Sequence, residues 1–278
     1  MSSLVQITRP HNCVAAALAS LLGAYLAGGV AHLLSPPVVG ASIVVGLVVA
    51  ACNVVNDHRD VTADRVDKPH RPIPSGRVSR RAAGGLALVL ALAALGVAWT
   101  LGPWPMAAIA LATTILGVGY SYCLKSTVLL GNGAIGLLCG TTVIYGGLAA
   151  GGLTPQVTMA GVLVSLFVFT REILKAIADR RGDTLAGVRT VATRLGTLAS
   201  LRLFQILAIV FVVAALAPWF LHLAGDRYLY AMLPCSILPT VVIAILLGFR
   251  PTERTIHVSL RVTKFLWFSS LSAMVLLK

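Results

Sequence analysis

Long apolar segments separated by short polar breaks recur along the whole chain. Each is about 20 residues long, the length that an α-helix needs to cross roughly 30 Å of hydrocarbon. The pattern predicts nine membrane spans, at residues 11–34, 37–56, 81–101, 104–123, 128–150, 155–178, 198–222, 228–249 and 257–277. No polar stretch between them is long enough for a separate soluble domain, and the first segment exceeds the apolar region of a signal peptide. We therefore expect one all-α, multi-pass membrane domain over residues 1–278.

Composition supports a bilayer environment. Of the 278 residues, 58% are hydrophobic and 11% are charged, which is too apolar for a water-soluble domain of this length. The net charge of +13 could suggest a nucleic-acid partner, but in a membrane protein the placement of basic residues is more informative than their sum. We expect no nucleic-acid partner, and we expect these charges to set orientation and to contact anionic membrane lipid.

The basic residues are distributed unevenly between the two sides of the membrane. With nine spans, one side carries Arg9, residues 59–81, Lys125, residues 171–202 and residues 250–264, whereas the other carries Arg227 and Lys278. Cytoplasmic segments of membrane proteins are enriched in Lys and Arg. We therefore expect the N-terminus in the cytoplasm and the C-terminus outside.

Acidic residues are scarce, and they are clustered. The chain has nine, and six of them lie in two short clusters, at residues 57–67 and 179–183. Each cluster follows a predicted span on the cytoplasmic side, where an ionisable group is costly without a partner and is a functional candidate by default. A helix end with i, i+4 ion pairs would explain one such cluster. Two clusters in a chain so poor in acids favour a functional site.

The first cluster continues the helix predicted for the second span. Asn56, Asp60 and Asp64 follow one another at i, i+4 and i+8, and Asp57 lies beside them in the same stripe along the helix. Like charges at this spacing repel one another, so the stripe favours a bound cation. Carboxylate and amide oxygens are hard ligands that suit Mg²⁺. We therefore predict these four residues as metal ligands.

The second cluster follows the sixth predicted span. Lys175, Asp179 and Asp183 are one helical turn apart on one face, and we predict both aspartates as further metal ligands. Two aspartate stripes among basic residues suit a Mg²⁺–diphosphate site, because the acids hold the metal while metal and bases neutralise the diphosphate. The chemistry expected there is ionisation of an allylic diphosphate, with an apolar pocket that shields the carbocation from water.

Five motifs along the chain resemble the UbiA superfamily of intramembrane prenyltransferases, and they occur in that family's order. They are Arg9-Pro10-His11-Asn12, Asn56-Asp57-x-x-Asp60-x-x-x-Asp64, Arg71-Pro72-Ile73-Pro74-Ser75-Gly76-Arg77, Tyr120-Ser121-x-x-Leu124-Lys125, and Asp179-x-x-x-Asp183-x-x-x-Gly187-x-x-Thr190-x-x-x-Arg194-x-Gly196. The resemblance covers residues 9–196, and residues 197–278 match only as three further spans. The aspartate motifs and the loop at residues 71–77 are the most specific of these features.

The resemblance implies nine helices around a central cavity with a cytoplasmic cap, Mg²⁺ as cofactor and a prenyl diphosphate as substrate. By analogy with the family, one Mg²⁺ would bind Asn56, Asp60 and Asp64, and another would bind Asp179 and Asp183. The catalytic candidates are the four aspartates of this set, Asp60, Asp64, Asp179 and Asp183. The candidates for diphosphate binding are Arg71, Lys125 and Lys175, by motif position and charge, together with Asn12 of the first motif.

The loop at residues 71–77 and the lead-in Arg171-Glu172-Ile-x-Lys175 most resemble archaeal-type digeranylgeranylglyceryl phosphate synthases. The loop is also similar to that of chlorophyll synthases. The chain departs from the first branch at Ala176 and Ala178, where that branch usually has an aspartate and a glutamate. The resemblance therefore leaves the acceptor open.

Three functions remain to be distinguished. The first is Mg²⁺-dependent transfer of a prenyl chain to a small acceptor, either an aromatic quinone precursor or a glycerol-phosphate lipid. The second is a membrane terpene cyclase, in which the same site ionises the diphosphate with no acceptor. The third is a transporter or cation channel, which is disfavoured because its acids should lie near the membrane midplane in two repeated halves.

Overall fold

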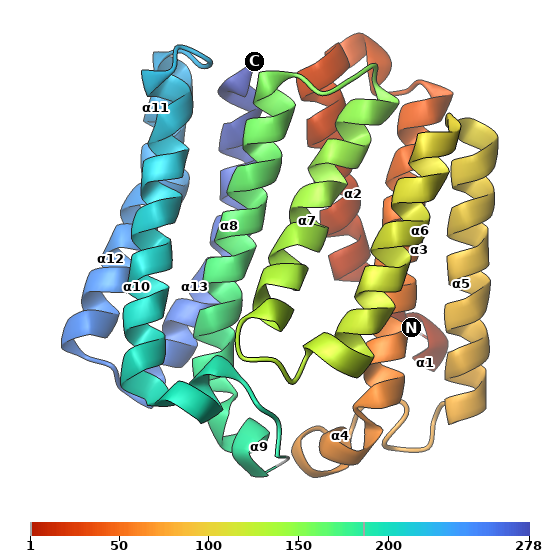
Figure 1. Cartoon of the computed structure of the whole chain (residues 1–278), viewed down its shortest axis with the longest axis vertical. Coiled ribbons are helices and arrows are strands. Elements are labelled where there is room, and N and C mark those ends of the chain that lie inside the picture. The colour runs from red at the N-terminus through yellow and green to blue at the C-terminus, as the bar shows by residue number, and fades with distance from the viewer. Residues whose placement is uncertain (1, 186) are drawn as a thin grey trace. The chain divides into compact units, whose positions relative to one another are not determined.

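The structure is a computed structural model that describes residues 2–185 and 187–278, and its description of side chains leaves out Val66 and Asp67. All secondary-structure elements within those residues are helical. Nine helices of the described chain are long and apolar enough to cross a membrane (Figure 1). The predicted all-α membrane fold with nine spans is confirmed. The central cavity and the cytoplasmic cap stay predictions.

The nine long helices follow the predicted spans closely. They are α2 (Pro10–Gly28), α3 (Pro36–Arg59), α5 (Arg80–Leu101), α6 (Trp104–Gly119) with the π-helical turn η2 (Tyr120–Leu124), α7 (Leu130–Ala149), α8 (Pro155–Ala178), α10 (Val191–Phe220), α11 (Asp226–Met232) joined by the π-helical η3 (Leu233–Ile237) to α12 (Leu238–Phe249), and α13 (Glu253–Met274) with the 3-10 turn η4 (Val275–Leu277). Four short elements complete the chain: α1 (Ser3–Thr8), η1 (Val30–His32), α4 (Val61–Asp67) and α9 (Arg180–Leu185).

Two helix ends differ from the predicted boundaries by six residues or more. The first span ends at Gly28 and not at residue 34, because Gly29 adopts φ 77° and a helix cannot continue through that conformation. Helix α10 begins at Val191, before the predicted residue 198, because Thr190 forms a capping box with Thr193. Gly196, with φ 79°, then interrupts α10, so its long apolar part starts beyond this residue, near the predicted position.

The chain divides into two compact units. Unit 1 consists of Met1–Leu124 and Thr142–Gly152, and unit 2 consists of Lys125–Thr141 and Leu153–Lys278. Unit 1 therefore contains α1 to α6 and the end of α7, and unit 2 contains the start of α7 and the helices that follow it. The prediction of a single domain over residues 1–278 stays a prediction.

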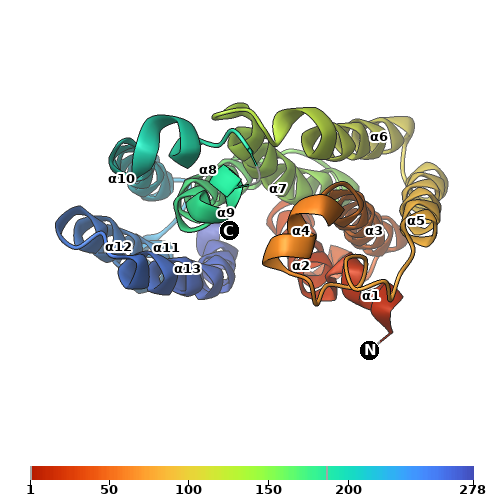
Figure 2. The same ribbon diagram turned by 90° about the horizontal axis from the view of Figure 1, so that it is seen from below.

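Helix α3 lies at the centre of unit 1 and packs against α2, α5 and α6. Small residues allow close approach, as expected where lipid surrounds the helices. A Cβ added to Gly146 of α7 would lie 1.8 Å from the carbonyl oxygen of Ser20 in α2. Figure 2 shows α1 and α4 beside the end of α3, where buried Ile7 packs with Val54 and Val61. This end of α3 carries the first aspartate cluster.

In unit 2, α8 packs against α10 and α13. The Phe167 and Phe211 rings meet edge to face with their centroids 5.5 Å apart. The start of α7 lies against α8 with backbone in contact, because a Cβ on Gly140 would lie 2.4 Å from the carbonyl oxygen of Gly161. Helix α8, whose last residue precedes the second aspartate cluster, is thereby packed against α7, α10 and α13.

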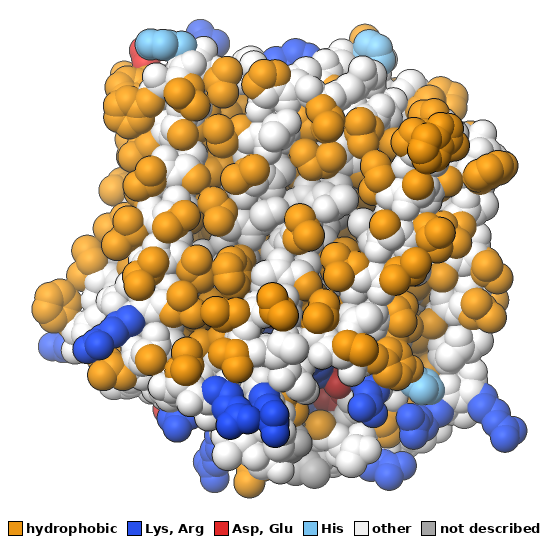
Figure 3. Space-filling model, in the orientation of Figure 1, with side chains coloured by type: hydrophobic (Ala, Val, Ile, Leu, Met, Phe, Trp, Pro, Cys, Tyr) orange, Lys and Arg blue, Asp and Glu red, His pale blue; other side chains and the backbone are white. Residues whose placement is uncertain are grey.

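The outward faces of the long helices are apolar. Leu88, Val89 and Leu92 on α5 are 61%, 63% and 58% exposed. Figure 3 shows apolar side chains along the helices of the visible face, with Lys and Arg side chains at helix ends. Contiguous exposed apolar surface of this kind marks contact with a membrane, which supports an integral, multi-pass protein.

Candidate functional site

The first aspartate cluster lies where α3 is interrupted. Helix α3 ends at Arg59, Asp60 has φ −82° and ψ 1°, and α4 begins at Val61. A ψ near 0° lies outside the helical range and in the sparsely populated bridge region, where active-site residues are often found. The backbone N–H of Asp60 still donates to Asn56 (2.9 Å), and that of Asp64 donates to Asp60 (2.8 Å).

The second cluster repeats this geometry in unit 2. Helix α8 ends at Ala178, Asp179 has φ −87° and ψ −1°, and α9 begins at Arg180. The backbone N–H of Asp179 donates to Lys175 (2.9 Å), and that of Asp183 donates to Asp179 (3.0 Å). The prediction that the first cluster continues the helix of the second span is wrong at Asp60, where the backbone leaves the helical conformation. The spacing of one turn is kept, because the i to i−4 hydrogen bonds continue across both breaks.

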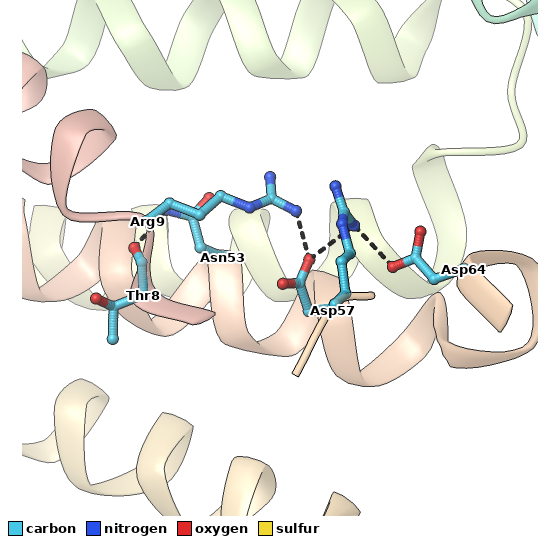
Figure 4. Close-up of polar contacts among 6 residues, drawn as sticks. Thr8, Arg9, Asn53, Asp57 and Asp64 are labelled. Atoms are coloured by element: carbon cyan, nitrogen blue, oxygen red, sulfur yellow. Dashed lines mark hydrogen bonds and ion pairs between the residues drawn. The ribbon is translucent and has the colours of Figure 1, made fainter. Parts of the chain in front are cut away.

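Two carboxylates of the first cluster are buried and neutralised by arginines. Asp57 is 5% exposed and Asp64 is 4% exposed. Oδ1 of Asp57 accepts hydrogen bonds from Nη2 of Arg9 and from Nη1 of Arg71 (3.2 Å), and the same Nη1 donates to Oδ2 of Asp64 (2.7 Å). Figure 4 shows Arg9 reaching Asp57 from the corner between α1 and α2. The structure therefore brings Arg71, which was predicted to bind diphosphate, together with Asp57 and Asp64 of the predicted metal cluster.

The remaining predicted residues of unit 1 are more accessible. Asn56 and Asp60 are half-buried at the end of α3. Asn12 is also half-buried, in the first turn of α2, where its backbone N–H donates to the carbonyl oxygen of Arg9 (2.8 Å). All the predicted site residues of this unit thus belong to α2, α3, α4 and the loop after α4.

The loop between α4 and α5, which carries Arg71, packs against the rest of unit 1. Ile73 and Val78 are 6% and 5% exposed and pack with Ile7 of α1. Gly76 has φ 78°, a left-handed conformation that glycine adopts without strain. Nη2 of Arg77 donates to the carbonyl oxygen of His70 (2.5 Å). Apolar burial and this turn together fix the position from which Arg71 reaches the two aspartates.

In unit 2, basic residues surround the second aspartate pair. Burial raises the pKa of the Asp183 carboxyl, and the nearby negative charge of Asp179 raises this pKa further. The positive charges of Lys125 and Lys175 oppose both effects, as does a hydrogen bond with Thr190. The structure thus places the four predicted residues of this unit within electrostatic reach of one another. A cation at this pair would relieve the repulsion between its carboxylates.

Glu172 is a charged residue that the sequence analysis did not select as a site residue. It is 8% exposed on α8. Its carboxylate lies 3.3 Å from Nζ of Lys175 and 3.3 Å from Nη1 of Arg171, and its backbone carbonyl accepts from Asn132 of α7 (3.4 Å). The signal that could have identified it was the rarity of a glutamate inside an apolar span. Glu172 orients Lys175, one of the predicted diphosphate ligands.

The donor atoms of both clusters are chemically suited to Mg²⁺. They are carboxylate and amide oxygens, and Mg²⁺ takes one or two carboxylates and completes its octahedron with phosphate oxygens and water. Among the described residues, no three His, Cys, Asp or Glu side chains lie close enough together to form a metal site from protein ligands alone. These donors suit a metal that shares its ligands with a phosphate.

A cavity of about 400 Å³ lies in unit 1, toward the end of α3 opposite the aspartates. Its walls include Pro37 and Val44 of α3, Met106 of α6 and Tyr145 of α7. Val44 is thirteen residues before Asp57, about 20 Å along a helix. The volume is that of a small-molecule site, but its apolar lining is unsuited to a diphosphate. The cavity is therefore not the predicted site for the charged end of a diphosphate.

Comparison with known proteins shows similarity to UbiA prenyltransferases. The model of the UbiA prenyltransferase family matches residues 16–269. Digeranylgeranylglyceryl phosphate synthase of Saccharolobus solfataricus is 30% identical over 280 residues, which cover 99% of this chain and 95% of that protein. The enzyme of the same name from Methanoculleus marisnigri is 37% identical over 198 residues, covering 70% of this chain and 69% of its own length.

Solved structures show the same fold. A structure of digeranylgeranylglyceryl phosphate synthase matches with a TM-score of 0.80 and 26% identity over 98% of this chain and 96% of that one. A UbiA homolog from Archaeoglobus fulgidus, solved with GPP and Mg²⁺ bound, matches with a TM-score of 0.75 and 16% identity over 98% and 99% of the two chains. At that identity the second likeness concerns the fold alone.

Proposed function

Because the chain belongs to the UbiA prenyltransferase family and is thus a membrane-embedded prenyltransferase, we propose that it transfers a prenyl chain from a prenyl diphosphate to a hydroxyl group of a glycerol-phosphate lipid. The observation that carries this choice of acceptor is the similarity to digeranylgeranylglyceryl phosphate synthase over 99% of this chain. An aromatic acceptor and cyclisation without an acceptor are the alternatives that the experiment below separates.

The reaction breaks the bond between the allylic carbon of the prenyl chain and an oxygen of the diphosphate, which leaves with the bonding electrons. The acceptor oxygen forms the new bond to that carbon, and its proton is released. The leaving diphosphate gains negative charge beside apolar helices, so it must be neutralised where it forms. Arg71, Lys125 and Lys175 are the proposed sources of positive charge, together with Asn12 as a hydrogen-bond donor.

The proposed metal ligands are Asn56, Asp60 and Asp64 for one Mg²⁺, and Asp179 and Asp183 for a second. When bound, Mg²⁺ would neutralise the diphosphate and so favour its departure. This part of the proposal rests on the hard oxygen donors of both clusters. The Archaeoglobus fulgidus protein of the same fold, which was solved with GPP and Mg²⁺, is compatible with it. We further propose that both clusters lie on the cytoplasmic side of the membrane.

The test is incubation of the purified chain in detergent with Mg²⁺ and prenyl diphosphates of about ten to twenty carbons. Parallel reactions contain a glycerol-phosphate lipid, an aromatic quinone precursor or no acceptor. Mass spectrometry follows the lipid products, and a phosphate assay follows diphosphate release. We expect an ether-linked product with the glycerol-phosphate lipid, and chelation of Mg²⁺ should abolish it.

Each other outcome would change the proposal. Turnover with the aromatic compound alone would replace the acceptor. Release of diphosphate without any acceptor, together with a cyclic hydrocarbon or alcohol, would identify a terpene cyclase. Retention of full activity after chelation of divalent metal would reject the proposed role of both aspartate clusters.

A further inference from the structure

Arg9 occupies an unusual position at the corner between α1 and α2. It has φ 53° and ψ 67°, a left-handed conformation that is unfavourable for a non-glycine residue unless its surroundings impose it. Pro10 follows it and opens α2. A residue before proline is normally extended, so this corner is held in place by contacts outside its own sequence.

Two residues of α3 supply those contacts. Nδ2 of Asn53 donates to the carbonyl oxygen of Thr8 (3.0 Å), and the carboxylate of Asp57 accepts from the Arg9 guanidinium. Asn53 and Asp57 are four residues apart and so lie on one face of α3, as Figure 4 shows. Buried Ile7, which is 1% exposed, adds an apolar contact on the same side. The corner is therefore fixed on α3, and the Arg9 side chain is directed at Asp57.

Asp57 is shared between two guanidinium groups. Its Oδ1 accepts from both Arg9 and Arg71, and its side chain is 7% exposed, whereas those of the two arginines are 26% and 24% exposed. Each guanidinium has five N–H donors in a planar fork that fits a phosphate group. One carboxylate oxygen thus holds two guanidinium groups, and each arginine keeps part of its side chain exposed.

This arrangement is poorly suited to metal ligation by Asp57. A Mg²⁺ ion about 2.1 Å from its carboxylate would lie within a few ångströms of two guanidinium charges, and like charges at that distance repel strongly in a partly buried site. Among the ion pairs of the described residues, Asp64 pairs with Arg71 and Asp57 pairs with both arginines. Asp60 is half-buried at the helix break. The two buried aspartates therefore have distinct roles.

We infer that Asp57 is a positioning residue that holds the guanidinium groups of Arg9 and Arg71 toward the diphosphate, which makes Arg9 a second diphosphate-binding arginine. The inference rests on the proposed function for the identity of the anion. By this inference Asp57 is not a metal ligand. Arg9, which was not predicted from the sequence, becomes a residue of the substrate site.

The test measures metal and diphosphate binding separately, on the purified full chain and without turnover. Electron paramagnetic resonance reports binding of Mn²⁺ in place of Mg²⁺. Calorimetry reports binding of geranylgeranyl thiolodiphosphate, an unreactive analogue, at saturating Mg²⁺. The variants are Asp57→Asn, Arg9→Ala, the double variant, and Asp60→Asn as the metal-site reference. Glu253→Gln, at the exposed start of α13, is the control.

We expect Asp57→Asn and Arg9→Ala each to weaken analogue binding about 10- to 100-fold, the range for losing charge-assisted hydrogen bonds. Both should keep Mn²⁺ binding within about threefold, whereas Asp60→Asn should lose it. The double variant should bind the analogue about as weakly as Asp57→Asn alone, because the contribution of Arg9 depends on Asp57. A purely structural role would instead lower the unfolding temperature and weaken both ligands together.

Loss of Mn²⁺ binding in Asp57→Asn, to the extent seen in Asp60→Asn, would make Asp57 a metal ligand and overturn the inference. Unchanged analogue affinity in Arg9→Ala would overturn it as well, and this variant decides the matter where Asp57→Asn fails to fold. Failure of the unmodified chain to bind the analogue would instead reject the proposed function. The two ideas can therefore fail separately.

Discussion

Asp60 and Asp179 occupy equivalent positions at the two helix breaks, with ψ of 1° and −1°. Asparagine has nearly the same shape and tolerates the same backbone conformation, so Asp60→Asn and Asp179→Asn should remove only charge and a metal ligand. We expect each to lower Mg²⁺-dependent diphosphate release by at least about 100-fold, as for loss of a principal electrostatic contact in an active site. The unfolding temperature should change little. Release at the unmodified rate in either variant would remove that aspartate from the site.

The sequence predicted these aspartates because acids are so rare in the chain, but it did not predict how each carboxylate is used. Asp57 and Asp64 belong to one motif and both are buried, yet among the described residues Asp57 pairs with two arginines and Asp64 with Arg71. That difference depends on the corner at Arg9, which lies 48 residues away along the chain. Glu172 was overlooked because its ion pair with Lys175 at i, i+3 is common at helix ends.

Helix α7 offers a matched test of close packing at the scale of a single element. A Cβ on Gly140 would lie 2.4 Å from a backbone oxygen of α8, whereas Gly133 on the same helix and in the same unit has open space around it. Gly140→Ala should therefore destabilise the protein by about 1–3 kcal/mol. Gly133→Ala should be neutral or stabilise it by up to about 1 kcal/mol, because alanine favours the helix.

Thermal unfolding in detergent would measure both variants. Gly140→Ala should unfold at a lower temperature than the unmodified chain, and Gly133→Ala at the same or a higher temperature. Equal unfolding temperatures for the two variants would show that the contact between α7 and α8 in unit 2 does not limit stability.

At the same scale, hydropathy located every long helix of the described chain but not the points where helices are interrupted. The length of an apolar segment decides whether it can span the membrane, and the sequence shows that length directly. The break at Asp60 leaves the i to i−4 hydrogen bonds in place, so no change in spacing or composition marks it. The early end of α2 at Gly28 had a signal in the Gly28-Gly29 pair, but the apolar residues that follow extended the predicted span to residue 34.

For the whole molecule, sequence was sufficient for the fold class and the family, because both follow from repeated apolar spans and from motifs in a fixed order. It was insufficient for the acceptor. Ala176 is 7% exposed on α8, at a position where the most similar branch usually has an aspartate, so a charged group of that branch is replaced here by a small apolar one. Which acceptor a pocket admits depends on its shape, and motifs report charge more directly than shape.

The distribution of basic residues predicts how the whole chain is oriented in the membrane. The segments after α3, α8 and α12 are rich in Lys and Arg, whereas Arg227 and Lys278 are the basic residues on the other side of a nine-span chain. Positive segments stay in the cytoplasm, so the N-terminus and both aspartate clusters should be cytoplasmic and the C-terminus should be outside.

A fluorescent protein fused after Lys278 should therefore be dark in a bacterial host, and alkaline phosphatase fused there should be active. Fusions that end at Lys125 should give the reverse result. Fluorescence from the fusion after Lys278 would contradict either the orientation or the odd number of spans. The Lys125 fusion decides between them, because it reports only the side reached after the first four spans. If it is fluorescent, the orientation is correct and the number of spans is wrong.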